Sequence, residues 1–376
     1  MSTQSITASA KDWIAALTRL SPAMAGKKSI AILYSVHIDP ATGALSGCDF
    51  ETSAVTTLTE SAGEGAPLLV SYRWLMDAIR TTTGKVKTAP VTVSLDGEKV
   101  TVSACGYELH AETMPIADYP EIPAPELEAY TILPAGELRN ALRRVSIAAS
   151  MDETTPILES VQVSLSSGAA EFLATDRYRL AEDHASGKGE GSGAFILGRR
   201  AVKAIDRFLI GGEILLGIGD GRIIIKTDAA TFTAMAIDGT YPKIKTLFPE
   251  TVTASFEFDR LVLLESTRVA QRMNEQHAPC IISMSASGAE VTFSYGLFGP
   301  AKAPVAAGGV IAGLADEIKC AFNPRYLAEA LQQIATDRVR ISYTTLPKPF
   351  LFTSGGLEIN DPESPKHLIM PVRMPS

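Results

Sequence analysis

The stretch Val91-Thr-Val-Ser-Leu-Asp-Gly-Glu-Lys-Val-Thr-Val102 alternates apolar and polar residues on both sides of an Asp-Gly pair. A period of two is typical of a strand with one buried and one exposed face, and an Asp-Gly pair supplies the positive φ angles of a tight hairpin. Residues 214–225 repeat the pattern around Asp220-Gly221, 124 positions further along the chain. We therefore expect an antiparallel hairpin in both places and a chain built from repeated units.

Two further markers show the same period and add a third unit. Apolar helical stretches end at Arg19-Leu20, Arg144-Val145 and Arg268-Val269, and a second helix follows Ser71, Gly198 and Asn323. No solenoid repeat is as long as this period, so each unit must be a domain with its own core. Three similar domains in one chain suggest a curved molecule or part of a ring.

The predicted fold class is α+β, with an antiparallel sheet and two helices in each of three similar domains. Two Pro-containing segments that resemble each other, Tyr119–Pro125 and Tyr241–Pro249, mark the boundaries. They place the domains at 1–124, 125–249 and 250–376.

Composition favours a globular protein, because 46% hydrophobic and 20% charged residues suit both a real core and solubility. The first residues lack the pattern of a signal peptide, and no run of about 18 apolar residues could span a bilayer. We therefore expect a cytoplasmic protein with no membrane partner. The four cysteines, Cys48, Cys105, Cys280 and Cys320, have no paired metal spacing, which favours buried free thiols over disulfides or zinc. No cofactor or metal is expected.

Charge is distributed unevenly along this acidic chain, whose formal net charge is −8. The six helical windows at 11–28, 71–87, 136–144, 198–208, 258–273 and 323–334 hold 19 Lys/Arg and 7 Asp/Glu, which leaves 15 and 35 for the remainder. The basic residues recur at spacings that place them on one helical face, as Arg139 does with Arg143. Any one such face could be an ordinary solvated surface, but the repetition favours a surface for phosphates.

Several segments, in order along the whole chain, resemble the bacterial DNA polymerase III β subunit family, the sliding clamps. They are Leu173-Ala-Thr-Asp-Arg-Tyr-Arg-Leu-Ala181, the Tyr-Pro segment at 241–249, Asn323-Pro-Arg-Tyr-Leu-Ala-Glu-Ala-Leu331, Leu346-Pro-Lys-Pro-Phe350 and Met370-Pro-Val-Arg373. The first unit has its own counterpart of the first of these in Gly47-Cys-Asp-Phe-Glu-Thr-Ser53.

The resemblance implies a DNA sliding clamp that gives the replicative polymerase its processivity and has no catalytic role. In this family two copies, joined head to tail, close a ring whose helices surround double-stranded DNA without reading its sequence. Exchangeable phosphate contacts allow such a ring to slide. The positions that we expect to face DNA are Lys27, Arg73, Arg80, Arg139, Arg143, Arg200, Lys203, Arg207, Arg268 and Arg272. As exposed residues they should contribute little to folding.

The resemblance also implies a hydrophobic cleft between the second and third domains for short peptides of partner proteins. The expected partners are the DNA polymerase III alpha subunit, the clamp loader and other proteins with a clamp-binding motif. The matching positions are Leu158, Thr175, Arg177, Tyr178, Arg179, Leu180, Pro242, Leu247, Leu368, Met370, Pro371, Val372 and Arg373. Aliphatic side chains and an adaptable Met suit an apolar pocket, and Arg179, Arg373 and the Thr175 hydroxyl could orient a peptide backbone. Without the resemblance, Leu180 and Leu247 would be interpreted as core residues.

Three features depart from the family pattern. Arg177-Tyr178 replaces the Gly-His of many members, so a long cation beside the pocket could change which peptides bind. The tail Met374–Ser376 extends past the usual end and could cover the cleft. The Ala/Gly-rich stretch 299–313 replaces an expected charged strand connection, which leaves the strand geometry of 296–320 open.

Two other classes of protein compete with this interpretation. For an enzyme, Gly217-Ile-Gly219-Asp-Gly221 resembles a dinucleotide loop, but no helix follows it, so a hairpin is favoured. Asp176 and His184 could form an acid/base pair, but no nucleophile or metal ligand accompanies them, and Asp176 suits a turn. An oligomeric β-rich scaffold that binds no DNA would explain the repeats but not the helix charge.

Overall fold

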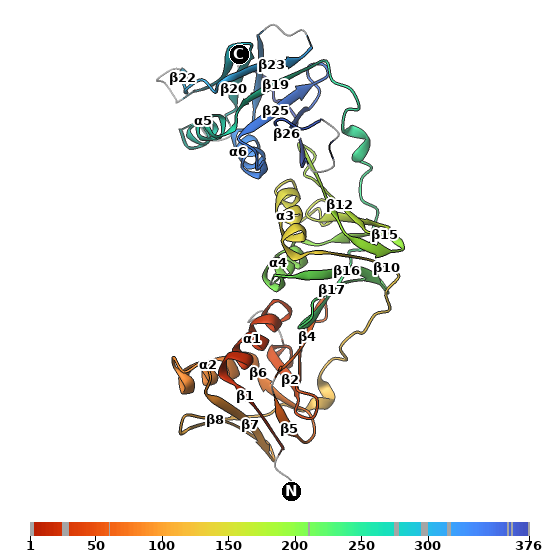
Figure 1. Ribbon diagram of the computed structural model, residues 1–376, viewed down its shortest axis with the longest axis vertical. Coiled ribbons are helices and arrows are strands. Elements are labelled where there is room, and N and C mark those ends of the chain that lie inside the picture. Colours follow the sequence, from red (N-terminus) through yellow and green to blue (C-terminus); the bar gives the residue numbers. More distant parts are fainter. Residues whose placement is uncertain are drawn as a thin grey trace.

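Figure 1 shows a curved, elongated molecule of three lobes, with the two ends of the chain at opposite ends of the curve. The computed structural model describes residues 4–24, 30–59, 61–209, 211–273, 278–294, 300–313, 317–358, 361 and 364–374. The helices follow the concave side, and the segments that join the lobes run along the convex side (Figure 1). The predicted α+β class is confirmed.

Each third of the chain contributes two α-helices, as the basic windows predicted. They are α1 (Ala10–Leu20), α2 (Tyr72–Thr83), α3 (Ala135–Ser146), α4 (Arg199–Phe208), α5 (Arg260–Met273) and α6 (Pro324–Gln333). Short polar side chains cap several of their first turns: the hydroxyl of Ser9 accepts from the backbone N–H of Asp12, and the amide oxygen of Asn323 does so from Arg325. None of these helices is long and apolar enough to cross a membrane.

The strands form four antiparallel sheets. The first has the order β5 (Ala62–Glu64), β1 (Gln4–Ser9), β7 (Pro90–Asp96), β8 (Lys99–Ala104) and β9 (Tyr107–Glu112). The second has the order β14 (Lys188–Glu190), β10 (Ala129–Pro134), β16 (Glu213–Gly219), β17 (Arg222–Lys226), β18 (Ala230–Met235), β4 (Thr52–Thr57), β3 (Ala44–Cys48), β2 (Ser35–Asp39) and β6 (Leu68–Ser71).

The third and fourth sheets lie towards the C-terminal end. The third has the order β15 (Ser192–Leu197), β11 (Val161–Ser166), β12 (Ala169–Thr175), β13 (Arg179–Ser186), β27 (Lys366–Ile369), β26 (Phe350–Ser354), β25 (Arg338–Tyr343), β19 (Ala254–Asp259) and β23 (Gly308–Ala312). The fourth has the order β22 (Pro300–Lys302), β21 (Gly288–Ser294), β20 (Cys280–Ser285) and β24 (Ile318–Phe322).

Both nine-stranded sheets are shared between successive repeats. In each, five strands of one repeat continue into four strands of the repeat before it. The joint is always the last strand of one repeat against the fourth strand of the preceding one: β18 pairs with β4, and β27 with β13. Backbone hydrogen bonds therefore run without a break from one lobe to the next.

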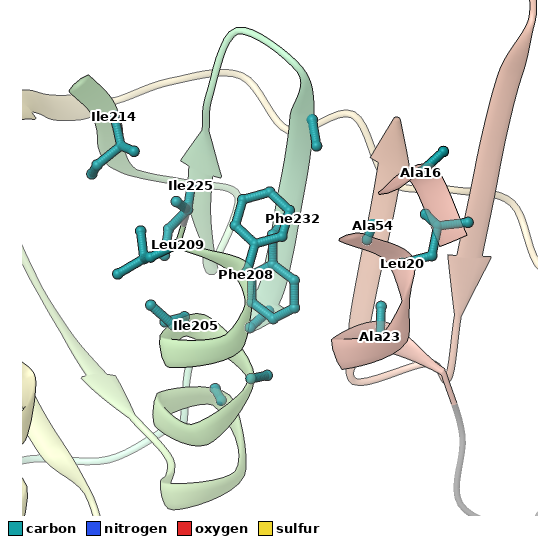
Figure 2. Close-up of a cluster of buried hydrophobic side chains, with 14 of the residues drawn as sticks. Ala16, Leu20, Ala23, Ala54, Ile205, Phe208, Leu209, Ile214, Ile225 and Phe232 are labelled. Atoms are coloured by element: carbon teal, nitrogen blue, oxygen red, sulfur yellow. The ribbon is translucent and has the colours of Figure 1, made fainter. Parts of the chain in front are cut away.

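Apolar side chains fill the junction between the first two repeats (Figure 2). Phe208 of α4 and Phe232 of β18 pack with ring centroids 5.5 Å apart and ring planes tilted by 39°. They are turned towards Ala16, Leu20 and Ala23 of the first repeat, and all five belong to one buried cluster (Figure 2). The first two repeats thus share a core.

Three details differ from the sequence predictions. The hairpin at 214–225 turns on Asp220 and Gly221, both with positive φ, but in the first repeat Asp96 is still paired to Lys99, so Gly97 alone has positive φ. Cys105 is exposed, whereas the other three cysteines are buried and free as expected. In the Ala/Gly-rich stretch, β23 pairs with β19, and the register between them shifts at Ser255/Phe256.

The shared core predicts a large effect for Phe232→Ala. Removing this fully buried ring should lower the free energy of unfolding by about 3–5 kcal/mol, because the rigid strands around it cannot close the cavity. Phe50, which is 57% exposed, provides the control: Phe50→Ala should cost less than about 0.5 kcal/mol. Urea denaturation of both variants measures the two changes in the free energy of unfolding. Equal changes would contradict a stabilising role of Phe232 in the core that the two repeats share.

Candidate functional site

Four basic side chains predicted to face DNA surround one acidic residue between α3 and α4. Arg139, Arg143, Lys203 and Arg207 line a shallow hollow of about 280 Å³ together with Asp206. Nε of Arg139 and Nη2 of Arg143 lie 3.2 and 3.1 Å from Oδ1 of Asp206. Arg139 lies beside Arg143 and Lys203 beside Arg207, as the spacing on each helix predicted, and the packing of α3 against α4 brings the two pairs together around one carboxylate.

Four further basic residues of the set lie on α2 and α5. Arg73 and Arg80 are exposed on α2, and Nε of Arg73 is 3.8 Å from Oδ2 of Asp77. On α5, Arg268 hydrogen-bonds Glu265 at 2.6 Å and Arg272 is exposed. Lys27 lies outside the described residues. A DNA contact for each of these residues stays a prediction.

Arg200 departs from the expectation that the basic residues of the set contribute little to folding. Its guanidinium pairs with the carboxylate of Asp49, which is buried, and with Glu51 at 2.9 Å. Asp49 also accepts hydrogen bonds from the backbone and hydroxyl of Thr52. Arg200 therefore ties α4 to the turn between β3 and β4 and is part of the fold.

The turn between β12 and β13, the centre of the predicted peptide cleft, is held by Asp176. Its Oδ1 accepts from the backbone N–H groups of Tyr178 and Arg179, both at 3.0 Å. Arg177 takes a φ of 78°, which this tight turn requires. The interpretation of Asp176 as a turn residue is confirmed.

Arg179 supports this turn from below and is only 4% exposed. Its guanidinium pairs with Asp176 at 3.0 Å and with Glu329 of α6, and it lies 4.3 Å from the centre of the Tyr326 ring. The Thr175 hydroxyl donates to the backbone oxygen of Arg179 at 2.8 Å. These bonds occupy Arg179 and the Thr175 hydroxyl, two of the three polar groups that we expected to orient a peptide, so in this structure both groups shape the turn.

Strands from distant parts of the chain meet beside this turn. Leu180 and Leu368 are register partners in β13 and β27, are 6% and 1% exposed, and belong to one buried cluster with Tyr241. The backbone N–H of Met370 donates to the backbone oxygen of Tyr178 at 2.9 Å. The two leucines are therefore the floor of the predicted cleft, as buried as core residues.

Most of the other predicted cleft residues are exposed. Tyr178, Leu247, Met370 and Val372 are 61%, 56%, 38% and 40% exposed. Pro242, Arg177 and Arg373 are also exposed, while Leu158 and Pro371 are half-buried. Met374 of the tail is 48% exposed. Large apolar side chains that face solvent around a buried apolar floor suit the binding of a peptide.

A polar cluster lies next to Leu247, the exposed leucine of this set. Glu171, Glu182 and His184 offer three possible metal ligands within 4.8 Å of one another. Lys245 bonds Glu171, and Lys366 lies 3.4 Å from Glu182. Burial opposes ionisation of Glu182, but the hydrogen bond with His184 and the charge of Lys366 outweigh it and lower the pKa of the carboxyl to about 2. Since lysines already neutralise both carboxylates, the cluster is explained as ion pairs.

The enzyme interpretation gains nothing from this geometry. Asp176 is committed to its turn and to Arg179, and His184 to Glu182, so they form no acid/base pair. Gly217–Gly221 belongs to the hairpin of β16 and β17.

Sequence reasoning missed two residues of the site, Tyr326 and Glu329. Both lie in the segment Asn323–Leu331, whose sequence resembles the family but indicates no role for either residue. Their spacing of three residues predicts that both lie on one face of α6. Nothing in the sequence predicts that this face contacts Arg179, about 150 positions away.

Comparison with known proteins places the chain in a family. Residues 132–243 match the family model for the central domain of the DNA polymerase III beta subunit, and residues 246–373 match that for its C-terminal domain. The beta sliding clamp of Micrococcus luteus is 34% identical over 226 residues, which cover 58% of this chain and 71% of that protein. This chain belongs to the DNA polymerase III beta subunit family. It is therefore a DNA sliding clamp of the replicative polymerase, a processivity factor without catalytic activity.

Other relatives cover nearly the whole chain. The beta sliding clamp of Streptomyces coelicolor is 29% identical over 343 residues, 88% of each chain. Among solved structures, the Bacillus subtilis sliding clamp and the Pseudomonas aeruginosa clamp bound to griselimycin each superpose with a TM-score of 0.88 over 99% of this chain and 100% of theirs, at 20% identity. These structures confirm the fold.

The two kinds of basic residue should respond differently to charge reversal. Arg200→Glu should lower the free energy of unfolding by about 1–3 kcal/mol, because it leaves the buried Asp49 facing a like charge, an effect moderated by solvent. Lys203→Glu, one turn away and exposed, should change it by less than about 0.5 kcal/mol. Thermal and urea unfolding measure the stability of both variants. An Arg200 variant as stable as the wild type would show that the ion pair with Asp49 does not stabilise the fold.

Proposed function

We propose that two copies of this chain close head to tail into a ring that encircles duplex DNA. The strand order of the sheets carries this proposal. Each nine-stranded sheet joins five strands of one repeat to four of the preceding repeat, and the remaining two sheets are a five-strand half ending in β9 and a four-strand half ending in β22. β9 corresponds to β18 and β27, and β22 to β4 and β13, so pairing β9 of one copy with β22 of another would complete the same sheet.

The side chains at these ends support the same contact. Leu20 and Val145 are fully buried at their junctions, while Val269, the third residue of this repeat position, is 38% exposed. Val269 lines an apolar hollow of about 500 Å³ with Leu261 and Phe293. At the other end, Leu109 of β9 pairs with Val102 as Phe232 of β18 pairs with Ile225. The occupant that fits the hollow is therefore β9 of a second copy, whose Leu109 would act as Phe232 does in the first junction.

The contact between two such copies is heterologous, because different surfaces meet, and it closes when the curvature brings both pairs of ends together. Two copies of three repeats would give six repeats with the helices inside. The basic helices would then face the duplex, where phosphate contacts need no sequence recognition and exchange freely. We include Lys27 and the nine other basic residues in this role, with Arg200 serving the fold as well. The ring would act in the cytoplasm.

The surface around Leu180 and Leu368 is the proposed docking site for partner peptides. Its partners would be the DNA polymerase III alpha subunit, the clamp loader and other proteins with a clamp-binding motif. One or two buried apolar side chains would each contribute roughly 1.5–3 kcal/mol, and after the cost of ordering the peptide the affinity would be about micromolar. The exposed Arg177 would favour acidic residues in the bound peptide.

The ring predicts that topology, not affinity, retains the protein on DNA. After loading by the clamp loader, the protein should stay on a closed circle and leave once the circle is linearised, even at a salt concentration that abolishes electrostatic binding. Val269→Glu provides the control, because a carboxylate in the apolar hollow should convert the dimer to monomers in light scattering and abolish retention. Equal retention on both forms of DNA, or a wild-type monomer at micromolar concentration, would contradict the ring.

The peptide surface predicts separate effects for two truncations. Deleting residues 370–376 should abolish binding of a fluorescent alpha-subunit peptide, because Met370 and Val372 are lost, while the dimer remains. Deleting 374–376 is the matched control and should preserve the affinity or raise it, if the tail shields the site. Fluorescence anisotropy measures both, and equal binding by the full chain and the longer truncation would rule out this surface.

A further inference from the structure

A second pocket lies where the first two repeats meet. Its volume is about 570 Å³, which is within the range of pockets that hold peptide side chains or small ligands. Four segments form its walls: the turn between β3 and β4, the end of β18, residues 156–160 and the first turn of α4. The proposed ring gives two residues of its wall, Arg200 and Lys203, a place near the duplex, but neither the ring nor the cleft accounts for the apolar part of this pocket.

The turn that forms one wall has the same construction as the turn of the cleft. The backbone N–H of Thr52 donates to Oδ1 of Asp49 at 2.7 Å, as Arg179 does to Asp176 at 3.0 Å. The residue after the aspartate has positive φ in both turns: 72° at Phe50 and 78° at Arg177. Two repeats therefore present the same loop at the same position.

The segment that follows the joining strand is also the same in both places. The backbone N–H of Met235 donates to the backbone oxygen of Glu51 at 2.8 Å. In the same way, the backbone N–H of Met370 donates to the backbone oxygen of Tyr178 at 2.9 Å. Two residues later, Ile237 donates to Ile196 at 2.9 Å, as Val372 does to Ala321 at 2.8 Å. Met235 therefore holds the place of Met370, and at 51% exposure its side chain is at least as available.

The pocket and the cleft are neighbours on the second repeat. Pro156, Glu159 and Ser160 line the pocket, whereas Leu158 between them belongs to the cleft set. Ile157 and Ile237 pack against the buried cluster that contains Leu180 and Leu368. The segment 156–160 thus contributes residues to both the pocket and the proposed cleft.

The chemistry of the walls indicates the kind of ligand. Met235, Ala236, Ile237 and Pro156 supply apolar surface. At the rim Arg199 pairs with Glu159 at 3.2 Å, and Arg200 with Glu51. Lys203, also at the rim, has no carboxylate partner in the part of the chain that the structure describes, so it is available to a negative charge on the ligand.

We propose that this pocket is a second peptide-docking site, which binds an extended segment that carries large apolar side chains next to an acidic residue. The apolar side chains would pack on Met235 and Ile237, and the carboxylate would pair with Lys203. The inference rests on the proposed function, because the ligand class is taken from the cleft whose backbone the pocket repeats. Each protomer would then hold two peptide segments, one at each internal junction.

Methionine methyl signals can follow both sites in one sample of the full-length protein. Met235 reports the pocket, Met370 reports the cleft, and Met76, which is buried, is the internal control. The probe is the peptide acetyl-Glu-Leu-Asp-Leu-Phe-amide, and a version with lysine for both acidic residues tests the charge requirement. Signals from ¹³C-methyl methionine are assigned with Met235→Leu and Met370→Leu.

We expect the acidic probe to shift the Met235 signal in the full chain and also after deletion of residues 370–376, with Met76 unchanged. Lys203→Glu should weaken the binding seen at Met235 by about tenfold or more, whereas Lys226→Glu, another exposed lysine, should leave it unchanged. The lysine probe should bind at Met235 at least as weakly as the acidic probe binds the Lys203 variant.

The outcomes separate this site from the cleft. A Met370 shift without a Met235 shift would overturn the second site and leave the cleft intact, and no shift at either would overturn both. A Met235 shift that disappears with residues 370–376 would also overturn it, because the signal would then be transmitted from the cleft. A Met235 shift alone would support the pocket and remove the cleft. Equal affinity of the acidic and lysine probes would overturn the assigned ligand chemistry.

Discussion

The pairing of the last strand of each repeat with the fourth strand of the preceding repeat is the constraint on which this structure depends. An isolated repeat would leave a row of backbone N–H and C=O groups unpaired at each of these edges, which is costly when buried and prone to aggregation when exposed. Pairing of β18 with β4 and of β27 with β13 removes two such pairs of edges within the chain. The same pairing fixes where neighbouring helices meet and places an equivalent turn and chain segment at both junctions.

The two junctions share this backbone but are held by different side chains. Between the first and second repeats, Phe208 and Phe232 pack on small aliphatic residues in one continuous core (Figure 2). Between the second and third, Arg179 pairs with Glu329 across the junction, and Arg144 pairs with Asp183 at 3.0 Å on the side of the second repeat. His367 is buried near Arg179 and Arg144. Burial, together with the positive charges of these arginines, lowers the pKa of the His367 imidazole to about 3, so the imidazole is neutral.

This difference bears on the two proposed peptide sites. Removing one partner of a buried ion pair leaves an uncompensated charge, so the turn of the cleft depends on Arg179 keeping its contacts with Asp176 and α6. The corresponding turn of the first repeat is held from α4 by Arg200, whose side chain is 58% exposed. A repeated backbone thus carries two surfaces of different polarity, basic around Arg177 at the cleft and mixed in charge around Glu51 at the pocket.

The sequence by itself determined the repeat, the six helices, the antiparallel hairpins and the pairs Arg139 with Arg143 and Lys203 with Arg207 on single helices, because strand and helix periodicities are local and recur at a fixed spacing. It also pointed to the segments around Leu180 and Met370, through resemblance to a family. Only the tertiary structure decided which polar groups are free. The local sequence does not distinguish Arg179 and Arg200 from the exposed basic residues near them. In the structure, each pairs with a carboxylate about 150 positions away. Burial and pairing depend on which strands join across repeats, and that information is not contained in any local pattern.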